Sequence, residues 1–426
     1  MKKFIIDGGV RLHGEVKVSG SKNSCLPIMA ATLLAPGKHL IHGVPKLGDI
    51  HTMMQILRVT GASVDWYKGA EESRLKDHTL IIDTSEVNNS EIPYEIVSKM
   101  RASFLVTGAL LGRLGSAHVA RPGGCAIGHR PIDEHLYGFK MLGAQLEEKH
   151  GYIHAKGNSL VGTEIHLNEQ SVTATENILL ASVTARGKTH IINGAKEPHI
   201  IELINFLNSI GTEIELENDI IMINGRSSLD QLHPSEYEIS ADYIEAGTLM
   251  IAAVITNGDI TLIRARWEDL TALITKLQEI GATLEKTNNG IRVKKNNVSK
   301  PCSIKTSPYP GFPTDLQPQL TSLLSIANGT SVVTETMFEQ RFNHIPELVR
   351  MGAQIEVDGR SAVINGVQSL SGAQVMASDI RGGAALVLAG LSAKGKTEIS
   401  RIYHIERGYE GLEVKLRGLG ANIKKV

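Results

Sequence analysis

The sequence predicts an α/β fold in which one unit of about 70 residues recurs six times. Two series of glycines support this prediction. In the first series, a glycine follows an apolar helical segment and opens a strand: Gly37, Gly115, Gly187, Gly258, Gly329 and Gly395. In the second series, a glycine follows another helical segment and opens another strand: Gly61, Gly143, Gly211, Gly281, Gly352 and Gly420. Glycine readily forms the left-handed cap of a helix, and the alternating residues after it are typical of strands.

Each unit therefore contains a helix, a strand, a loop, a second helix, a strand and a further strand. Six such units fit two globular halves of three units each better than an open solenoid. No low-complexity or proline-rich linker divides the halves. We expect the chain to cross between them near Tyr237–Asp242, just before the fourth unit, and a second time at Ser19–Ser21.

The second unit carries an insertion that points to function. The glycines of a pair are 24, 28, 24, 23, 23 and 25 positions apart, and the surplus of the second unit falls in Arg121–Asp133. This glycine-rich loop places Cys125 between Arg121 and Arg130. Because neighbouring guanidinium groups favour the thiolate, we expect a reactive thiol. Without further information, a plain surface turn explains the loop about equally well.

The first helix of each unit begins 14 to 16 residues before its glycine, and polar residues gather there. Helix capping is the simplest explanation for Asp242, Asp315 and Asp379. Lys22, Arg101 and Arg381 are harder to explain, because the helix dipole already places positive charge at an N-terminus. Such cations are expected where an anion docks. We therefore expect these helix starts to face a shared cleft for a ligand with several phosphates or carboxylates.

The composition excludes several classes of protein. The chain has 426 residues, 42% of them apolar, and a formal net charge of −1, which argues against a general nucleic-acid or membrane-surface binder. The three cysteines are far apart in the sequence and do not indicate a disulfide framework. We expect Cys25 to lie in the core and Cys302 to be an unreactive thiol. The sequence has no P-loop, dinucleotide-binding glycine motif or zinc spacing. No membrane helix or signal peptide is indicated, so we expect a cytoplasmic protein.

The chain resembles the enolpyruvyl transferases from Gly14 to its C-terminus. Besides Gly14–Asn23, the matching motifs are Met100–Ser103, Arg121–Asp133, Phe312–Asp315, Thr334–Glu339, Asp379–Arg381 and Arg401–Tyr409. The resemblance implies two inside-out α/β barrel domains, each of three βαβαββ repeat units. One domain is expected at 22–239, and the other combines 1–21 with 240–426. The implied reaction transfers the enolpyruvyl group of phosphoenolpyruvate to the 3'-hydroxyl of UDP-N-acetylglucosamine and releases phosphate, the first committed step of peptidoglycan synthesis.

The resemblance also gives roles to the matched residues. Cys125 would protonate the methylene carbon of phosphoenolpyruvate, and Asp315 would accept the sugar hydroxyl proton or position the sugar. The phosphate and carboxylate would be held by Lys22, Arg130 and Arg407, with Asn23 and Arg381 completing the shell. The UDP-sugar site would contain Arg101, Arg130, Pro131, Ile132, Asp133, Glu134, Asp315 and Met337. Glu134 stands where many relatives have an apolar residue. No metal or organic cofactor is implied.

Two alternatives remain open at this point. Enolpyruvylshikimate-phosphate synthase shares the fold and reaction type, although it lacks the cysteine loop. A non-catalytic UDP-sugar-binding paralogue is the second alternative. Every matched catalytic position of this chain holds a chemically competent residue, which favours the enzyme.

Overall fold

The computed structural model describes residues 2–68, 78–122, 127–128, 131–157, 159–226, 228–295 and 298–426. The chain forms two compact units, and the crossings lie between Ser19 and Gly20 and between Ser240 and Ala241. Unit 2 comprises the residues from Gly20 to Ser240 except for a short segment around Ile127 and Gly128. Unit 1 comprises that segment, the residues before Gly20 and those after Ser240. The domain bounds expected from the sequence are 22–239 and, for the other half, 1–21 with 240–426.

The described part of unit 2 contains three four-stranded sheets. The strand order of the first sheet is β14 (Glu236–Glu238), β3 (Lys38–His42), β5 (Leu80–Asp83) and β4 (Ser63–Trp66). That of the second is β6 (Glu91–Ile92), β7 (Ser116–Ala120), β9 (Tyr152–Lys156) and β8 (Gln145–Lys149). That of the third is β10 (Glu164–His166), β11 (Lys188–Ile192), β13 (Ile220–Asn224) and β12 (Glu213–Glu217). Its inner helices are α1 (Lys22–Ala31), α4 (Val106–Leu114) and α6 (Val172–Ser182). Its other helices are α2 (Gly48–Val59), α3 (Tyr94–Val97), α5 (Asp133–Met141), α7 (Pro198–Ser209), η1 (Thr32–Leu34), η2 (Arg101–Leu105) and η3 (Leu229–Gln231).

The described part of unit 1 repeats this plan. Its sheets are β16 (Thr283–Thr287), β17 (Gly290–Lys294), β15 (Asp259–Ile263) and β2 (His13–Lys17); β18 (Ile304–Lys305), β19 (Thr330–Thr334), β21 (Ser361–Asn365) and β20 (Gln354–Asp358); and β22 (Gln374–Met376), β23 (Lys396–Ser400), β1 (Phe4–Asp7) and β24 (Asn422–Lys425). Its inner helices are α8 (Tyr243–Ile255), α10 (Gln317–Leu324) and α12 (Ile380–Ser392). Its other helices are α9 (Thr271–Glu279), α11 (Ile345–Arg350), α13 (Leu412–Gly418), η4 (Glu268–Leu270), η5 (Thr314–Leu316) and η6 (Ile405–Arg407).

All six of these sheets have the same pairing pattern over the described residues. One edge strand runs parallel to its neighbour, and the two remaining pairs are antiparallel, as in β6 ∥ β7 followed by β7–β9 and β9–β8. The parallel edge strand comes from a neighbouring repeat unit. In unit 1 the N-terminal strands β1 and β2 complete the last and the first of the three sheets, pairing with β23, β24 and β15. The repeat predicted from the glycines is thus confirmed.

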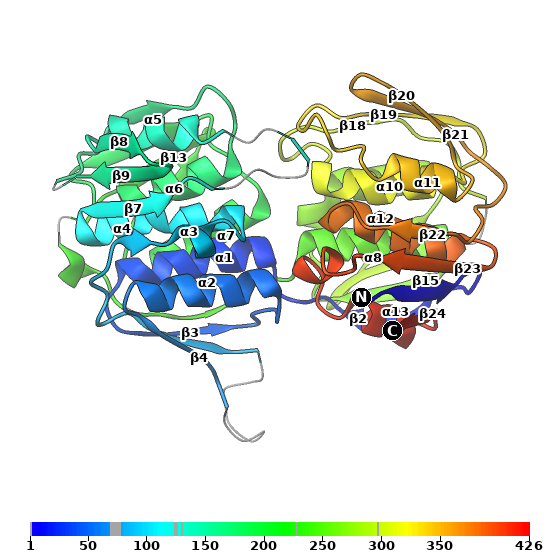
Figure 1. Ribbon diagram of the computed structural model, residues 1–426, viewed down its shortest axis with the longest axis horizontal. Helices are drawn as coiled ribbons and strands as arrows, with labels where there is room; N and C mark the ends of the chain where they lie inside the picture. Colours follow the sequence, from blue (N-terminus) through cyan, green and yellow to red (C-terminus); the bar gives the residue numbers. More distant parts are fainter. Residues whose placement is uncertain are drawn as a thin grey trace. The chain divides into compact units, whose positions relative to one another are not determined.

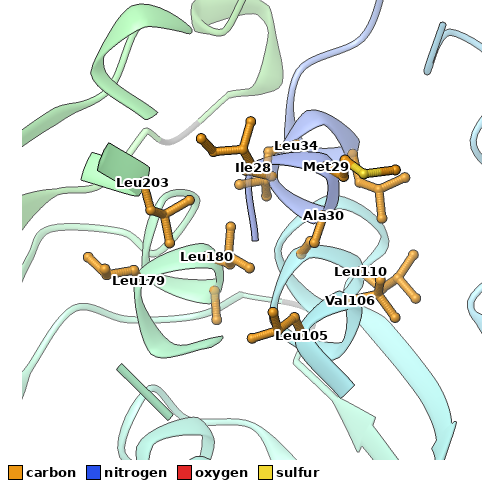
Figure 2. Close-up of a cluster of buried hydrophobic side chains, with 14 of the residues drawn as sticks. Ile28, Met29, Ala30, Leu34, Leu105, Val106, Leu110, Leu179, Leu180 and Leu203 are labelled. Atoms are coloured by element: carbon orange, nitrogen blue, oxygen red, sulfur yellow. The ribbon is translucent and has the colours of Figure 1, made fainter. Parts of the chain in front are cut away.

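Each unit places helices in its interior and sheets outside. Every residue of α8 is buried, because this helix is apolar on all sides, whereas the strands bury alternate residues on one face only. Figure 1 shows α8, α10 and α12 within unit 1 with strands around them, and α1, α4 and α6 occupy the same place in unit 2. The core of unit 2 forms where α1, η2–α4, α6 and α7 meet, and Figure 2 draws Ile28, Leu105 and Leu180 among its buried side chains. This is the inside-out arrangement that the resemblance implies.

The glycines of the second series all have positive φ, between 90° and 105°, as the capping argument requires. The first series differs at one position. Asn257 takes the left-handed conformation, with φ 51°, and the next residue, Gly258, does not. Gly258 is there for space, because a Cβ atom would lie 2.4 Å from the carbonyl oxygen of Leu12. No helix among the described residues is long and apolar enough to cross a membrane.

Candidate functional site

Lys22 begins α1 in unit 2 and is held by a carboxylate that the sequence did not single out. The Ser21 hydroxyl caps this helix by accepting from the Ser24 amide at 3.2 Å. Lys22 is buried, and its Nζ lies 3.1 Å from Oδ2 of Asp49, a buried residue in the first turn of α2. The neighbouring Asn23 is half-buried. The sequence did contain a signal for this partner, because Asp49 is an acidic residue in the first turn of the next helix, α2.

Arg101 lies with the segment that leads into α5. Its Nη2 donates to the carbonyl oxygen of Pro131 at 2.8 Å, so these two predicted residues are brought together. Arg101 begins the 3₁₀ turn η2, and α4 follows only at Val106, so the α-helix starts later than predicted. Ile132 is buried and precedes α5, whose first residue, Asp133, is exposed.

Glu134 and His135 fix the start of α5 to the rest of unit 2. The Glu134 carboxylate accepts from the Asn168 amide at 3.3 Å, so this side chain has a contact of its own within the chain. The ring of His135 lies 3.1 Å from the Thr173 hydroxyl and 2.9 Å from the Asn177 amide nitrogen. Buried polar groups of this kind hold a helix in one position, since each needs its partner. Hydrogen bonds therefore join the predicted Arg101 to Pro131 and anchor Glu134 within the same unit.

Cys125 and Arg130 lie outside the described residues, so their predicted roles stay predictions. Arg121, which was expected to favour the thiolate, pairs with Glu148 at 2.6 Å on the surface. That ion pair offsets the charge on which the expectation relied. Burial raises the pKa of the Cys25 thiol, and burial together with Glu279 raises the pKa of Cys302 to about 11. Both thiols are buried, in agreement with their predicted core and inert roles.

Asp315 in unit 1 has a different role from the helix caps with which it was grouped. Asp242 and Asp379 do cap α8 and α12, each accepting from two backbone amides. Asp315 lies in η5 without a capping bond, so the capping explanation is wrong for this residue. Its Oδ1 lies 2.5 Å from Nη2 of Arg341, and its Oδ2 accepts from Nε and Nη2 of Arg381 at 3.1 and 3.0 Å.

Arg381 is buried and held on its other side by Tyr409. The guanidinium lies 5.2 Å from the centre of the Tyr409 ring. Burial disfavours its charge, but Tyr409, Asp315 and Asp242 outweigh burial, so the pKa of Arg381 is raised. The Tyr409 hydroxyl in turn meets Thr248 and Gln319 at 3.0 Å each. The predicted Asp315 and Arg381 therefore lie together, in a network that reaches from η5 to the segment just after η6.

Met337 lies in the turn after β19, and its amide donates to the buried carboxylate of Glu335 at 2.7 Å. The same carboxylate accepts from the hydroxyls of Thr306 and Thr314 at 2.9 Å each. Glu335 thus ties the Met337 turn to the residue before Asp315, a connection that the sequence did not reveal. Arg407 lies in η6 and is half-buried, and its neighbour Glu406 pairs with Lys425.

Lys22 and Arg381 lie in the first turns of α1 and α12, where cations are expected if an anion docks, and each is paired with a carboxylate of its own unit. Among the described residues, no group of three or more His, Cys, Asp or Glu side chains is placed to hold a metal ion. Within each unit, several of the predicted residues are held by contacts: Lys22 by Asp49, Arg101 by Pro131, and Asp315 by Arg381. The cleft that the helix starts of both units are expected to share stays a prediction.

Comparison with known proteins identifies the class. Residues 6–416 match the family model described as EPSP synthase (3-phosphoshikimate 1-carboxyvinyltransferase), and the chain belongs to this family. The fold agrees: the enolpyruvyl transferase NikO from Streptomyces tendae superposes with a TM-score of 0.88 at 24% identity, covering 100% of this chain and 99% of that one. EPSP synthase from Acinetobacter baumannii gives a TM-score of 0.76 at 20% identity, covering 100% of both chains.

Sequence relatives are closer than these structures. The chain is 50% identical to UDP-N-acetylglucosamine 1-carboxyvinyltransferase 2 of Carboxydothermus hydrogenoformans, with 100% of both chains covered. It is 48% identical to UDP-N-acetylglucosamine 1-carboxyvinyltransferase 1 of Staphylococcus aureus strain MRSA252, again with 100% of both chains covered.

Proposed function

We propose that this chain transfers the enolpyruvyl group of phosphoenolpyruvate to the 3'-hydroxyl of UDP-N-acetylglucosamine, with release of phosphate, as the first committed step of peptidoglycan synthesis. The observation that carries the proposal is the sequence identity to relatives named UDP-N-acetylglucosamine 1-carboxyvinyltransferase. About half of the residues are identical, and 100% of both chains is covered. The buried Lys22 and the Asp315–Arg381 pair support it, because they suit an anionic substrate and a hydroxyl nucleophile.

In the proposed reaction, the sugar oxygen forms a bond to the central carbon of phosphoenolpyruvate. Asp315 accepts the hydroxyl proton or positions the sugar for its loss. The methylene carbon takes a proton from Cys125. The carbon–oxygen bond to phosphate then breaks, and the methyl carbon loses a proton as the double bond returns. Lys22, Arg130 and Arg407 would bind the phosphate and carboxylate, with Asn23 and Arg381 beside them. Arg101, Pro131–Glu134 and Met337 would bind the UDP-sugar.

The second candidate function is that of enolpyruvylshikimate-phosphate synthase, which the description of the matching family favours. One assay decides between them: phosphate release from phosphoenolpyruvate with either UDP-N-acetylglucosamine or 3-phosphoshikimate as acceptor. We expect turnover with the UDP-sugar alone. Turnover with 3-phosphoshikimate alone would reverse the choice. UDP-sugar binding without phosphate release would instead make the protein a non-catalytic paralogue.

Cys125 is tested by its reactivity. We propose that the epoxide fosfomycin alkylates this thiol, because Cys25 and Cys302 are buried and have raised pKa values. Mass spectrometry of the intact chain at neutral pH should show one adduct, and the Cys125→Ser variant should show none. Cys302→Ser serves as the matched control and should keep the adduct. An adduct that persists in the Cys125→Ser variant would assign the reactive thiol elsewhere.

A further inference from the structure

Glu335 is a buried carboxylate on which three segments of unit 1 converge. Only 1% of this residue is exposed, and it directly follows β19. Its Oε1 accepts from the Thr306 hydroxyl at 2.9 Å and from the Met337 and Phe338 amides at 2.7 and 3.2 Å. Its Oε2 accepts from the Thr314 hydroxyl at 2.9 Å. One side chain therefore joins the end of β18, the turn η5 and the segment after β19.

These bonds explain why a carboxylate can lie inside the unit. Removing an acidic side chain from water is unfavourable unless new hydrogen bonds replace those to water. The two hydroxyls and two backbone amides that donate to Glu335 supply this replacement. Hydrogen bonds to a carboxylate are about twice as strong as those between neutral groups. The three segments are therefore held firmly at this point.

Two of the three segments carry residues that we expect to bind the substrate. Met337 donates its own amide to Glu335, and Asp315 directly follows Thr314 in η5. η5 has only three residues and no side-chain cap, and a turn this short has little stability of its own. Its position depends on tertiary contacts such as the Thr314–Glu335 bond, whose partners are 21 positions apart in the chain.

We propose that Glu335 is a positioning residue, which fixes Asp315 and the backbone at Met337 relative to each other. The sugar hydroxyl and the nucleotide then meet a preformed part of the site in unit 1. This inference rests on the proposed function, in which Asp315 meets that hydroxyl and Met337 binds the UDP-sugar. The family resemblance gives Glu335 no role of its own. Glu335 acts through Thr314 and through the Met337 amide.

The two sides of the Glu335 carboxylate support different parts of the activity. The bond from Thr314 leads to Asp315, which meets the reacting hydroxyl, so its loss lowers kcat. The bond from the Met337 amide leads to the sugar nucleotide, so its loss weakens UDP-N-acetylglucosamine binding. A residue that only stabilised the fold would not separate these two quantities.

The first test compares Glu335→Ala with Glu335→Gln in the full chain. Glu335→Ala should lower kcat for phosphate release about 100-fold, because a misplaced catalytic group loses activity on this scale. It should also weaken UDP-sugar binding about 10-fold in calorimetry, the scale of one hydrogen bond. Glu335→Gln keeps one oxygen for the Met337 and Phe338 amides, and its NH₂ group can donate to the Thr314 hydroxyl. It should retain UDP-sugar binding and most of kcat.

The second test removes only the bond that leads to Asp315. Thr314→Val should lower kcat about 10-fold and leave UDP-sugar binding unchanged, and Thr314→Ser, which keeps the hydroxyl, should return kcat toward wild type. Thr256→Val is the matched control. Thr256 is likewise a threonine of unit 1, and its hydroxyl donates to the Ala252 carbonyl at 2.8 Å at the end of α8. This variant should lower stability but leave kcat and UDP-sugar binding unchanged.

A double-mutant cycle shows whether Thr314 acts through Glu335. Thr314→Val should lower kcat in the wild-type background and change it little in the Glu335→Ala background. Equal losses in both backgrounds, or a folded Thr314→Val variant with wild-type kcat, would overturn the inference. If Glu335→Ala does not fold, the comparison of Thr314→Val with Thr314→Ser decides. A wild-type chain that releases no phosphate with UDP-N-acetylglucosamine removes the proposed function itself. An active wild-type chain with unaffected Glu335 and Thr314 variants removes only the positioning role.

Discussion

The Lys22–Asp49 pair is a structural contact made by a residue that we propose binds substrate. Both side chains are buried, and Nζ and Oδ2 lie 3.1 Å apart. Removing one member of a buried ion pair destabilises the fold because a charge then loses its compensation. Any effect of a Lys22 substitution on activity is therefore mixed with an effect on stability, and a second substitution is needed to separate them.

We expect Lys22→Met to lower the free energy of unfolding by about 1–3 kcal/mol, less than for an isolated buried pair because Asp49 has further contacts. It should also lower kcat/KM for phosphoenolpyruvate about 100-fold or more, with UDP-sugar binding retained. Lys22→Met/Asp49→Asn should recover stability without recovering phosphoenolpyruvate use. Denaturant unfolding and steady-state kinetics measure the two effects. If the double variant regains kcat/KM as well, Lys22 does not bind phosphoenolpyruvate.

His344 makes stability depend on pH. The ring is fully buried, and burial lowers its pKa to about 4. An unfolded histidine has a pKa near 6.5, so the unfolded chain binds this proton first. The resulting stability is complete above about pH 6.5 and is lost progressively as pH falls toward 4.

We expect His344→Leu to lose less stability than wild type between pH 7 and pH 5, as measured by denaturant unfolding at each pH. His166→Leu is the control, because His166 is exposed on β10, and it should follow the wild-type pH dependence. Equal pH dependence in His344→Leu and wild type would mean that His344 is not buried as a neutral ring.

At the scale of elements, close helix packing depends on small residues at particular positions. Gly108 of α4 faces α6, and a Cβ atom there would lie 2.2 Å from the carbonyl oxygen of Asn177. The same asparagine accepts from the Gly108 amide at 2.8 Å and donates to the Phe104 carbonyl at 3.0 Å. The contact between α4 and α6 therefore requires glycine at position 108.

Gly108→Ala should lower the free energy of unfolding by about 1–3 kcal/mol or more, since the helices must move apart. Gly418→Ala is the matched control: Gly418 is also helical, in α13, and a Cβ atom there would meet nothing within 4 Å among the described residues. It should be neutral or stabilise by about 0.5–1 kcal/mol through helix propensity. Chemical denaturation compares the two, and a Gly108→Ala variant as stable as Gly418→Ala would contradict the packing.

At the scale of the whole molecule, unit 1 is closed by the first strand of the chain. β1 lies between β23 and β24, with Phe4 and Ile6 buried in the core. The two ends of the chain also pair directly: the Lys3 amide donates to the Val426 carbonyl at 2.8 Å, and the reverse bond is 3.0 Å. We therefore expect the sheet to need β1 as a strand but not to need this strand at the N-terminal end of the chain.

Deleting residues 2–8 should expose amides of β23, β24 and α12 to hydrogen exchange, because the sheet loses a central strand. A circular permutant that joins Val426 to Lys2 through a short linker and opens between the exposed Asn218 and Asp219 should retain their protection. Exchange measured by mass spectrometry distinguishes the two. Protection that survives the deletion would show that β1 is dispensable.

The local features of this fold follow from the sequence because they depend on neighbours along the chain. The second series of glycines has positive φ as predicted, and apolar segments such as α8 are buried on all sides. Local patterns also led to errors. Asp315 has the position of a cap but pairs with Arg341 and Arg381, and Gly258 provides space where a left-handed turn was expected.

The sequence by itself thus determined the repeat, the buried helices and, through family motifs, most residues of the candidate site. Only the tertiary structure decided which side chains hold these residues: Asp49 for Lys22, and Arg341 with Arg381 for Asp315. The physical reason is distance along the chain. Arg341 and Arg381 are 26 and 66 residues from Asp315, and the contact with Arg381 forms only when two successive repeat units pack against each other.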